Sequence, residues 1–333
     1  MNIGILGFIL ATLVEPLPKT AEAPHDNQTN VAKIELGKQL YFDPRLSVDG
    51  TVSCQSCHNL MSGGDDSRAN SVGVGGQKGG RSAPTVWNSA FYSTLFWDGR
   101  AASLEEQAKG PMVNPIEMGM KDHSVVVERI RKLPGYVKQF GQAFGVKEAV
   151  TIENAAKAIA AFERTLITTN SPFDRYARGD KKALSTLQLA GLKLVQDVGC
   201  TSCHAGANFS GPPLPAGTGF FQKFPTFSDN AYVERFELAK DVGRFGVTKS
   251  EADRNMWRVP TWRNVALTAP YFHNGSVKTL DEAVRVMAKT QLNKDLADGE
   301  VTAIVAFLGS LTGPFPKIEL PRLPELANAT LIE

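Results

Sequence analysis

The sequence predicts a mainly α-helical protein made of two similar domains in tandem. Apolar residues recur at three- and four-residue spacing in residues 32–42, 153–166 and 187–195, which is the period of an α-helix with one buried face. Little of the chain alternates between apolar and polar residues as a strand would. The pattern Cys-x-x-Cys-His occurs twice, at 54–58 and at 200–204, and each copy follows one of these helical stretches.

A longer repeat supports a tandem duplication. Residues 83–107 align without gaps on residues 259–283, and the matched positions include Pro84 with Pro260, Asn88 with Asn264, Phe96 with Phe272, and Gly99 with Gly275. Each copy ends in a capping box, begun by Ser103 and Thr279, in which a hydroxyl and a later carboxylate bond to free amides at a helix start. A helix is therefore predicted to begin at the next residue of each copy.

The second of these helices carries a methionine on its apolar face. Leu280, Val284 and Met287 fall on one side of a helix at three- and four-residue spacing. Met287 is therefore expected to face inward. The equivalent position of the first copy is Pro111, so the two copies are expected to differ at this point.

The chain is divided into a leader and two domains. Residues 3–14 are apolar and are followed by an acidic residue and a proline, so this segment is too short to cross a bilayer as a helix. We interpret residues 1–23 as an export leader, with an interfacial anchor or a buried segment as the alternatives. Residues 24–170 then form the amino-terminal domain, and residues 171–333 form the carboxy-terminal domain with an extended, proline-containing tail from Gly313.

The composition excludes one class of partner. The 333 residues, 42% of them apolar, are enough to build two domains with cores of their own. The 36 Lys and Arg residues are balanced by 34 Asp and Glu residues. A nucleic-acid surface would need a basic excess, so no nucleic-acid partner is expected.

All four cysteines lie in the two Cys-x-x-Cys-His patterns. Two such pairs can bind zinc, and one pair can form a redox-active dithiol, but neither site needs the histidine that follows each pair. Covalent haem attachment needs all three residues, because each thiol adds to a haem vinyl group and the histidine binds the iron. We therefore expect two covalently bound haem c groups, one on Cys54, Cys57 and His58 and one on Cys200, Cys203 and His204. Attachment takes place outside the bacterial cytoplasm, which together with the leader predicts a periplasmic protein.

The two haems are expected to have different roles. A haem with two strong axial ligands transfers electrons, whereas one with an open position activates oxygen species. Met287 is the expected sixth ligand of the second haem, with Met256 as the alternative. Near the first haem, Glu117 lies among apolar residues in MVNPIEMGM, where a desolvated carboxylate would have a raised pKa and could move a proton. The alternative interpretation of Glu117 is an ordinary exposed glutamate.

These residues resemble those of bacterial dihaem cytochrome c peroxidases over nearly the whole chain. The shared motifs include FDPRLS, APTVWN, FWDGRA, EQAKGP, EADRN, RVPT and RNVALTAPYFHNGS. The resemblance implies reduction of hydrogen peroxide at a low-potential amino-terminal haem, with electrons that arrive from a small cytochrome c or cupredoxin through a high-potential carboxy-terminal haem. It implies that Glu117 and Gln107 are the distal acid-base pair, that Trp97 bridges the haems and that Met287 binds the second iron. It also implies a homodimer.

The chain departs from this family at the distal side of the first haem. The family has a histidine that caps the peroxidatic iron until the other haem is reduced, and here Val74 stands in its place, with Gly76 in place of a nearby tryptophan. Valine offers iron no lone pair, so we predict a first haem that is open in the oxidised protein and needs no reductive activation. His123 and His25 are the alternative ligands.

A second departure concerns calcium. Family members often hold a calcium ion between the domains, and the backbone carbonyls of Thr268 and Pro270 match two of its ligands. Ser82 stands where the family has an asparagine, and a hydroxyl is a weaker ligand for this cation than an amide oxygen. A calcium ion is therefore expected, with weakened binding.

Two other functions compete with a peroxidase. One is a protein-modifying dihaem oxygenase of the same superfamily, which has a tyrosine in place of the methionine ligand. The other is a dihaem electron carrier without catalysis, which would fit an exposed Glu117.

Overall fold

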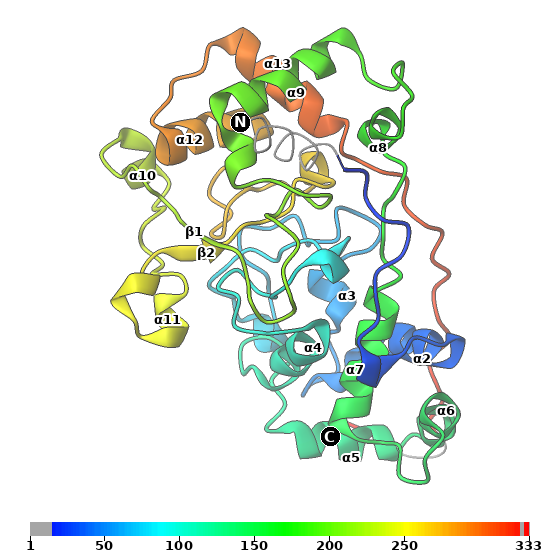
Figure 1. Cartoon of the computed structure of the whole chain (residues 1–333). Coiled ribbons are helices and arrows are strands. Elements are labelled where there is room, and N and C mark those ends of the chain that lie inside the picture. The colour runs from blue at the N-terminus through cyan, green and yellow to red at the C-terminus, as the bar shows by residue number, and fades with distance from the viewer. Residues whose placement is uncertain (1–14, 327–329, 333) are drawn as a thin grey trace, which may run out of the picture.

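The computed structural model describes residues 15–326 and 330–332. The prediction of a mainly α-helical chain is confirmed, and Figure 1 shows two helical halves, one above the other. The lower half contains α2 (Val31–Phe42), α3 (Cys54–Cys57), α4 (Leu104–Val113), α5 (His123–Arg131), α6 (Pro134–Phe144) and α7 (Ile152–Glu163). The upper half contains α8 (Pro172–Ala177), α9 (Thr186–Val198), α12 (Leu280–Leu292) and α13 (Asp298–Gly309).

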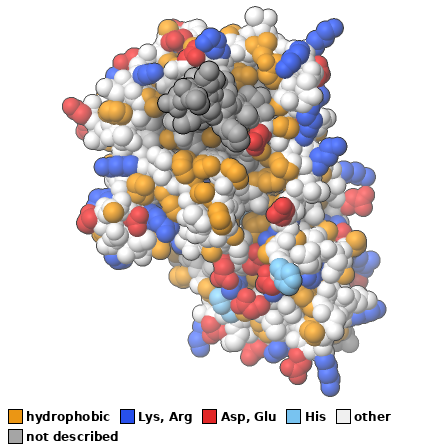
Figure 2. Space-filling view, viewed as in Figure 1, with side chains coloured by type: hydrophobic (Ala, Val, Ile, Leu, Met, Phe, Trp, Pro, Cys, Tyr) orange, Lys and Arg blue, Asp and Glu red, His pale blue; other side chains and the backbone are white. Residues whose placement is uncertain are grey.

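A small sheet and two short helices lie on one side of the molecule, at the left of Figure 1. The described residues contain one sheet, an antiparallel pair of β1 (Phe221–Lys223) with β2 (Met256–Arg258). Beside it are α10 (Ala231–Arg235) and α11 (Phe245–Thr248). None of the helices in the described ranges combines the length and the hydropathy that a bilayer crossing requires. On the face seen in Figure 2, acidic and basic side chains are interspersed and apolar side chains gather in the middle.

The same close crossing of two helices occurs in each half. In the lower half α2 contacts α7, and a Cβ atom on Gly37 would lie 1.8 Å from the carbonyl oxygen of Ala158. In the upper half α9 contacts α13, and a Cβ atom on Gly191 would lie 2.0 Å from the carbonyl oxygen of Ala303. Because only glycine lacks this atom, it alone lets the backbones approach so closely. The two halves therefore share one helix arrangement, as the repeat predicts.

Replacement of Gly37 by alanine is expected to destabilise the protein by about 1–3 kcal/mol, because the added methyl group forces α2 away from α7. The matched control is Gly141→Ala in α6, where an added Cβ atom meets no atom within 4 Å. That change removes a glycine from a helix and is expected to stabilise the protein by up to about 1 kcal/mol. Denaturant unfolding of both variants measures the difference between their free energies of unfolding. If the Gly37 variant is as stable as the Gly141 variant, the close crossing does not exist.

The two copies of the repeat have matching backbone conformations. Asn88 and Asn264 have φ values of 63° and 59°, and Phe96 and Phe272 have φ values of 66° and 71°. Residues other than glycine rarely adopt positive φ values, so their recurrence at equivalent positions is a specific similarity. Both helices that follow, α4 and α12, begin at the predicted residue. These agreements are consistent with a tandem duplication.

The two copies also contact each other through equivalent residues. Ser82 N donates a hydrogen bond to the carbonyl oxygen of His273 (2.8 Å), and Arg258 N donates one to the carbonyl oxygen of Trp97 (2.9 Å). In the repeat, Ser82 is equivalent to Arg258 and Trp97 is equivalent to His273. The junction between the halves is therefore a reciprocal contact, and Trp97 is part of it.

Each half has its own apolar core. The first core includes Leu40 of α2, Ile130 of α5 and Phe162 of α7. The second includes Leu192 of α9 and Phe307 of α13. The separate cores support the division of the chain between residues 170 and 171, which we keep as the proposed domain boundary.

The two ends of the described chain cross to the opposite half. Leu17 is fully buried, and its N–H donates to Asp174 Oδ1 of the upper half (2.9 Å). Of the predicted leader, residues 1–14 lie outside the described ranges, and the rest is part of the described fold. After α13 the tail is extended, as predicted, and it runs down the side of the lower half in Figure 1. Leu331 is buried in the core of that half.

Candidate functional site

The first Cys-x-x-Cys-His pattern forms a single helical turn, α3, followed by His58. Ser53 and Ser56 form a capping box at the start of the turn, and the hydroxyl of Tyr41 donates to the carbonyl oxygen of His58 (2.6 Å). The Nδ1 atom of His58 lies 2.9 Å from the carbonyl oxygen of Pro84. A carbonyl can only accept, so Nδ1 carries the proton and Nε2 has the lone pair that an iron ligand needs.

The second pattern holds His204 in a similar way. Its Nδ1 atom lies 3.0 Å from the carbonyl oxygen of Phe209, so Nε2 is again the nitrogen with the lone pair. The imidazole ring stacks on Trp262, with ring centroids 4.4 Å apart and planes 19° apart. His204 is 5% exposed, and burial lowers its pKa to about 4. Burial also lowers the pKa of His58, so both patterns present a fixed imidazole that stays neutral at pH 7.

The four cysteines are free and half-buried. Burial raises the pKa of Cys57 and of Cys200 to about 11, so these thiols stay protonated. A redox-active dithiol needs a lowered thiol pKa, so this alternative does not suit these residues. Over residues 15–326 and 330–332, no group of three or more His, Cys, Asp or Glu side chains is placed to hold a metal ion. Two thiols beside one fixed neutral histidine, in each half, are the residues that fit a covalently attached haem.

Glu117 lies half-buried in the loop between α4 and α5. Burial raises its pKa above the usual value, against the opposing effects of the Arg100 charge and of a hydrogen bond from Asn114. Asn114 Nδ2 donates to Glu117 Oε1 (2.6 Å). One carboxylate oxygen is thus held in place, which leaves Oε2 as the oxygen that can take a proton. Glu117 is not an ordinary exposed glutamate.

Val74 lies against the loop that carries Glu117. Its N–H donates to the carbonyl oxygen of Glu117 (2.9 Å), and its side chain is 4% exposed. A Cβ atom on Gly119 would lie 2.8 Å from Val74 Cγ2. Gln77 Nε2 donates to the carbonyl oxygen of Pro115 (3.0 Å), so the segment around Val74 is bonded to this loop at two points. The structure therefore brings the valine and the carboxylate together, although they are far apart in sequence.

Neither of the two alternative histidine ligands of the first haem, His123 and His25, is in a favourable position to bind the iron. His123 is the first residue of α5, and its Nε2 atom lies 3.0 Å from the carbonyl oxygen of Lys109. His25 is exposed. The His123 ring is thus hydrogen-bonded to a backbone carbonyl, and the His25 ring is on the surface.

The other predicted site residues lie on both sides of the junction. Gln107 is a half-buried residue of α4, and in the described chain no hydrogen bond joins it to Glu117. Trp97 Nε1 donates to the carbonyl oxygen of Ser82 (2.8 Å). The Trp97 ring packs against the same apolar cluster of the upper half as Met287. Met256 lies in β2 and is not among the side chains of that cluster, so the structure associates Met287 rather than Met256 with Trp97.

The residues of the predicted calcium site lie where the halves touch. Thr268 and Pro270 are half-buried in one loop, and a Cβ atom on Gly63 would lie 2.5 Å from the backbone of the same loop. Ser82 is 7% exposed, and its hydroxyl lies 3.4 Å from the carbonyl oxygen of Arg68. These positions allow a cation between the halves, and the calcium ion stays a prediction.

Sequence patterns do not reveal all the residues around the site. Asn114 could have been found, because it precedes Glu117 by three residues in a turn. The charge of Arg100 lowers the pKa of Glu117 because the folded chain brings the two residues near each other. The FWDGRA motif does not predict this contact. Trp262 stacks on His204, but its counterpart in the first copy is Val86, so the repeat gives no sign of this role.

The chain is similar to known proteins over most of its length. The family model for di-haem cytochrome c peroxidases matches residues 31–182. A cytochrome c551 peroxidase of Pseudomonas aeruginosa is 44% identical over 322 residues, which cover 96% of this chain and 90% of that protein. A cytochrome c551 peroxidase of Nitrosomonas europaea is 44% identical over 301 residues, which cover 90% of this chain and 86% of that protein. The crystal structure of a MauG-like protein associated with microbial copper homeostasis is similar with a TM-score of 0.77 and 30% identity, over 89% of this chain and 95% of that chain.

Proposed function

The chain belongs to the di-haem cytochrome c peroxidase family, and from this premise we propose how it reduces hydrogen peroxide. We propose a periplasmic enzyme that takes electrons from a small cytochrome c or a cupredoxin. The amino-terminal half is the peroxidatic one, and the oxidised protein is active without prior reduction. The observation that carries this proposal is the half-buried Glu117 held against Val74, at the position where the family has a histidine.

Each half supplies the residues for one haem. Cys54 and Cys57 would attach the first haem covalently, and His58 would bind its iron through Nε2. The second pattern would do the same in the other half through His204, and Met287 would supply a further ligand to that iron. The haem, when bound, supplies an iron that gives and accepts single electrons, which the cleavage of peroxide requires.

Glu117 moves a proton between the two oxygens of the peroxide. Cleavage to water requires that one oxygen loses a proton and the other gains one, so a single base near both is effective. Glu117 Oε2 accepts the proton from one oxygen and returns it to the other, which leaves as the first water. Two electrons from the donor protein and two protons from solvent convert the remaining oxygen to the second water. The raised pKa helps the carboxylate to hold the proton between the two transfers. Gln107 orients the peroxide through its side-chain amide.

Val74 would leave the first iron without a protein ligand on the side of Glu117. Its side chain has no lone pair, and its backbone N–H is used to hold the Glu117 loop. Of the two histidines that could replace it, His123 is engaged by a backbone carbonyl and His25 is exposed. This supports a first site that accepts peroxide in the oxidised protein.

The second half receives electrons and passes them on. A histidine and a methionine are two strong ligands, and such a haem transfers electrons without binding oxygen species. Trp97 lies at the junction, bonded to Ser82 of its own half and packed with Met287 against the core of the other. Electrons therefore cross the junction through Trp97. We further propose a weakly held calcium ion at the carbonyls of Thr268 and Pro270, and a homodimer.

The two competing functions are less well supported. A protein-modifying oxygenase has tyrosine where this chain has Met287. A simple electron carrier has no use for Glu117, a half-buried carboxylate with a raised pKa.

Steady-state reduction of hydrogen peroxide by reduced cytochrome c, started from the fully oxidised protein, tests the proposal. We expect the full rate from the first turnovers. No peroxide reduction would indicate an electron carrier, and only slight reduction would indicate a protein-modifying enzyme, so either result contradicts the proposal. A lag that prior reduction of the protein removes would contradict the open first site.

A further inference from the structure

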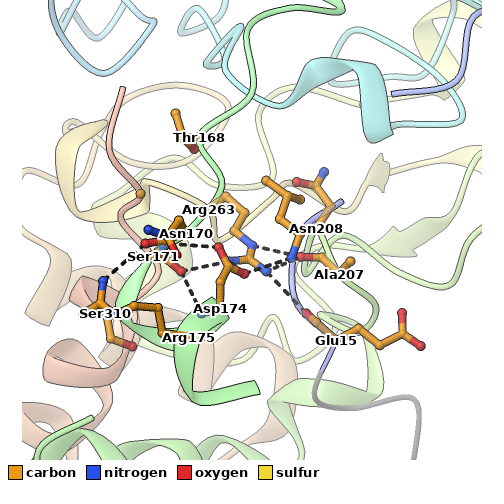
Figure 3. A network of polar contacts seen from close by, with 12 residues as sticks. Glu15, Thr168, Asn170, Ser171, Asp174, Arg175, Ala207, Asn208, Arg263 and Ser310 are labelled. Carbon is orange, nitrogen blue, oxygen red and sulfur yellow. Dashed lines mark hydrogen bonds and ion pairs between the residues drawn. The ribbon is translucent and has the colours of Figure 1, made fainter. Parts of the chain in front are cut away.

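A buried ion pair lies behind the histidine of the second half. Arg263 and Asp174 are both completely inaccessible to solvent, and Arg263 Nη1 lies 2.8 Å from Asp174 Oδ1. In Figure 3 the guanidinium group of Arg263 lies between the carboxylate of Asp174 and the backbone at Ala207. A buried charge pair is costly to desolvate, so it is weak evidence for a role in stability. A role in positioning is the better explanation.

The arginine holds the loop that follows the second Cys-x-x-Cys-His pattern. Arg263 Nε and Nη2 donate to the carbonyl oxygen of Ala207 at 2.8 and 2.6 Å. The next carbonyl of the loop accepts from Thr261 Oγ1 (2.5 Å). The carbonyl after that, of Phe209, accepts from His204 Nδ1 (3.0 Å). Three successive carbonyls are thus bonded, and the last of them accepts the hydrogen bond of His204 Nδ1.

The carboxylate of the pair is bonded from several sides. Besides Arg263, Asp174 accepts hydrogen bonds from Leu17 N (2.9 Å) and from Ser171 N (3.0 Å). Arg178 Nη2 donates to the carbonyl oxygen of Leu17 (2.9 Å), so the amino-terminal segment is held on both sides of this residue. Because its partners are fixed, the guanidinium group has one geometry.

In the described part of the chain, the first half has no ion pair at the equivalent position. The position equivalent to Arg263 is Trp87, which is fully buried and whose Nε1 has no hydrogen-bond partner in the described chain. There, His58 Nδ1 is held by the carbonyl of Pro84, within the repeat itself. The backbone of Pro260, the equivalent of Pro84, also acts on His204, but the Nδ1 hydrogen bond of His204 goes to the carbonyl of Phe209, in a loop held by a buried cation.

We propose that Arg263 is a positioning residue for His204. Through Ala207 it holds the carbonyl of Phe209, and that carbonyl sets the orientation of the imidazole and the strength of its Nδ1 hydrogen bond. The hydrogen bond of a ligand histidine tunes the metal it binds. Arg263 thus contributes to the difference between the two haems, an inference that rests on the proposed function of the second half.

The test compares three variants of the full chain with both haems bound. Arg263→Met combined with Asp174→Leu removes both charges, so that neither is left buried alone, and such replacements often preserve stability. Arg263→Lys keeps the charge but loses the paired bonds to Ala207, because lysine has a single nitrogen at its end. Arg175→Ala is the matched control. It removes an exposed cation from α8, the helix that also carries Asp174.

We expect the double variant to shift both the reduction potential of the second haem and its electron paramagnetic resonance signal, with the first haem unchanged. Arg263→Lys should give a smaller shift, and Arg175→Ala should give none. Unchanged second-haem signals in the double variant overturn the inference. If the double variant does not bind haem, the Arg263→Lys variant provides the test instead. An unchanged reduction potential and resonance signal of the second haem in Arg263→Lys would then overturn the inference. These measurements do not use peroxide, so loss of the proposed peroxidase function would be seen separately in the turnover assay.

Discussion

Replacement of Glu117 by glutamine is expected to slow peroxide turnover by about 10²- to 10⁴-fold, with both haems retained. Glutamine has almost the same shape, and its carbonyl oxygen can still accept the hydrogen bond from Asn114, so the loop should keep its structure. It cannot take up and return a proton, which is the function that we assign to the carboxylate. Stopped-flow measurement of peroxide reduction by reduced cytochrome c gives the rate.

The pH dependence of turnover gives a second test of Glu117. The carboxylate must be ionised to accept a proton, and its pKa is raised by burial. Activity of the unmodified protein should therefore fall with decreasing pH at a value above the usual 4.5 for glutamate. This acid limb should be absent from the Glu117→Gln variant. Glu106→Gln is the matched control, because Glu106 is an exposed residue of α4 whose carboxylate is paired with Lys109. Near-normal turnover in Glu117→Gln would remove this residue from the mechanism.

Replacement of Met287 by leucine is expected to lower the reduction potential of the second haem by on the order of a tenth of a volt or more, within the span of about 0.8 V that axial ligands control. A thioether ligand raises the potential, and leucine has a similar volume without the sulfur. The side chain should still pack against the cluster that includes Trp97. A potentiometric titration measures the change.

Met256→Leu is the control for this experiment, because Met256 is the other methionine considered as a ligand. It lies in β2, and its replacement should leave the potential of the second haem unchanged. If Met256→Leu lowers the potential and Met287→Leu does not, the ligand assignment is wrong.

Local sequence patterns predict those parts of the fold that local interactions determine. The starts of α4 and α12 follow from a serine and a threonine whose hydroxyls accept from the backbone three residues later. The Cys-x-x-Cys-His patterns predict fixed histidines, and each histidine is held by a backbone carbonyl. The raised pKa of Glu117 follows from the apolar residues beside it in sequence. In each case the interacting groups are near each other in the chain or in its repeat.

Contacts between distant segments are not visible in such patterns. Nothing in the sequence around Leu17 shows that it is buried against Asp174, which lies 157 residues away. The crossing of the tail to the first half depends in the same way on the shape of the folded surface, as the burial of Leu331 shows. The buried pair of Arg263 with Asp174 also needs the folded chain, because the repeat has tryptophan at the equivalent position.

The two halves show how one scaffold can hold two unequal sites. Their helix crossings and repeat backbones agree, whereas the side chains that surround the two histidines differ. At the equivalent position the first half has Pro111 and the second has Met287. The first half has the half-buried carboxylate of Glu117 held against Val74. This difference in side chains is the basis for the division of labour that we propose.

Electron paramagnetic resonance of the fully oxidised protein tests this division most directly. A haem iron with an open or water-bound face gives a high-spin signal, whereas one bound by histidine and methionine gives a low-spin signal. We predict one signal of each kind in equal amounts, with the high-spin signal lost from a variant that lacks the first Cys-x-x-Cys-His pattern. A spectrum that is entirely low-spin would show that a side chain closes the first iron despite Val74, and it would contradict the account.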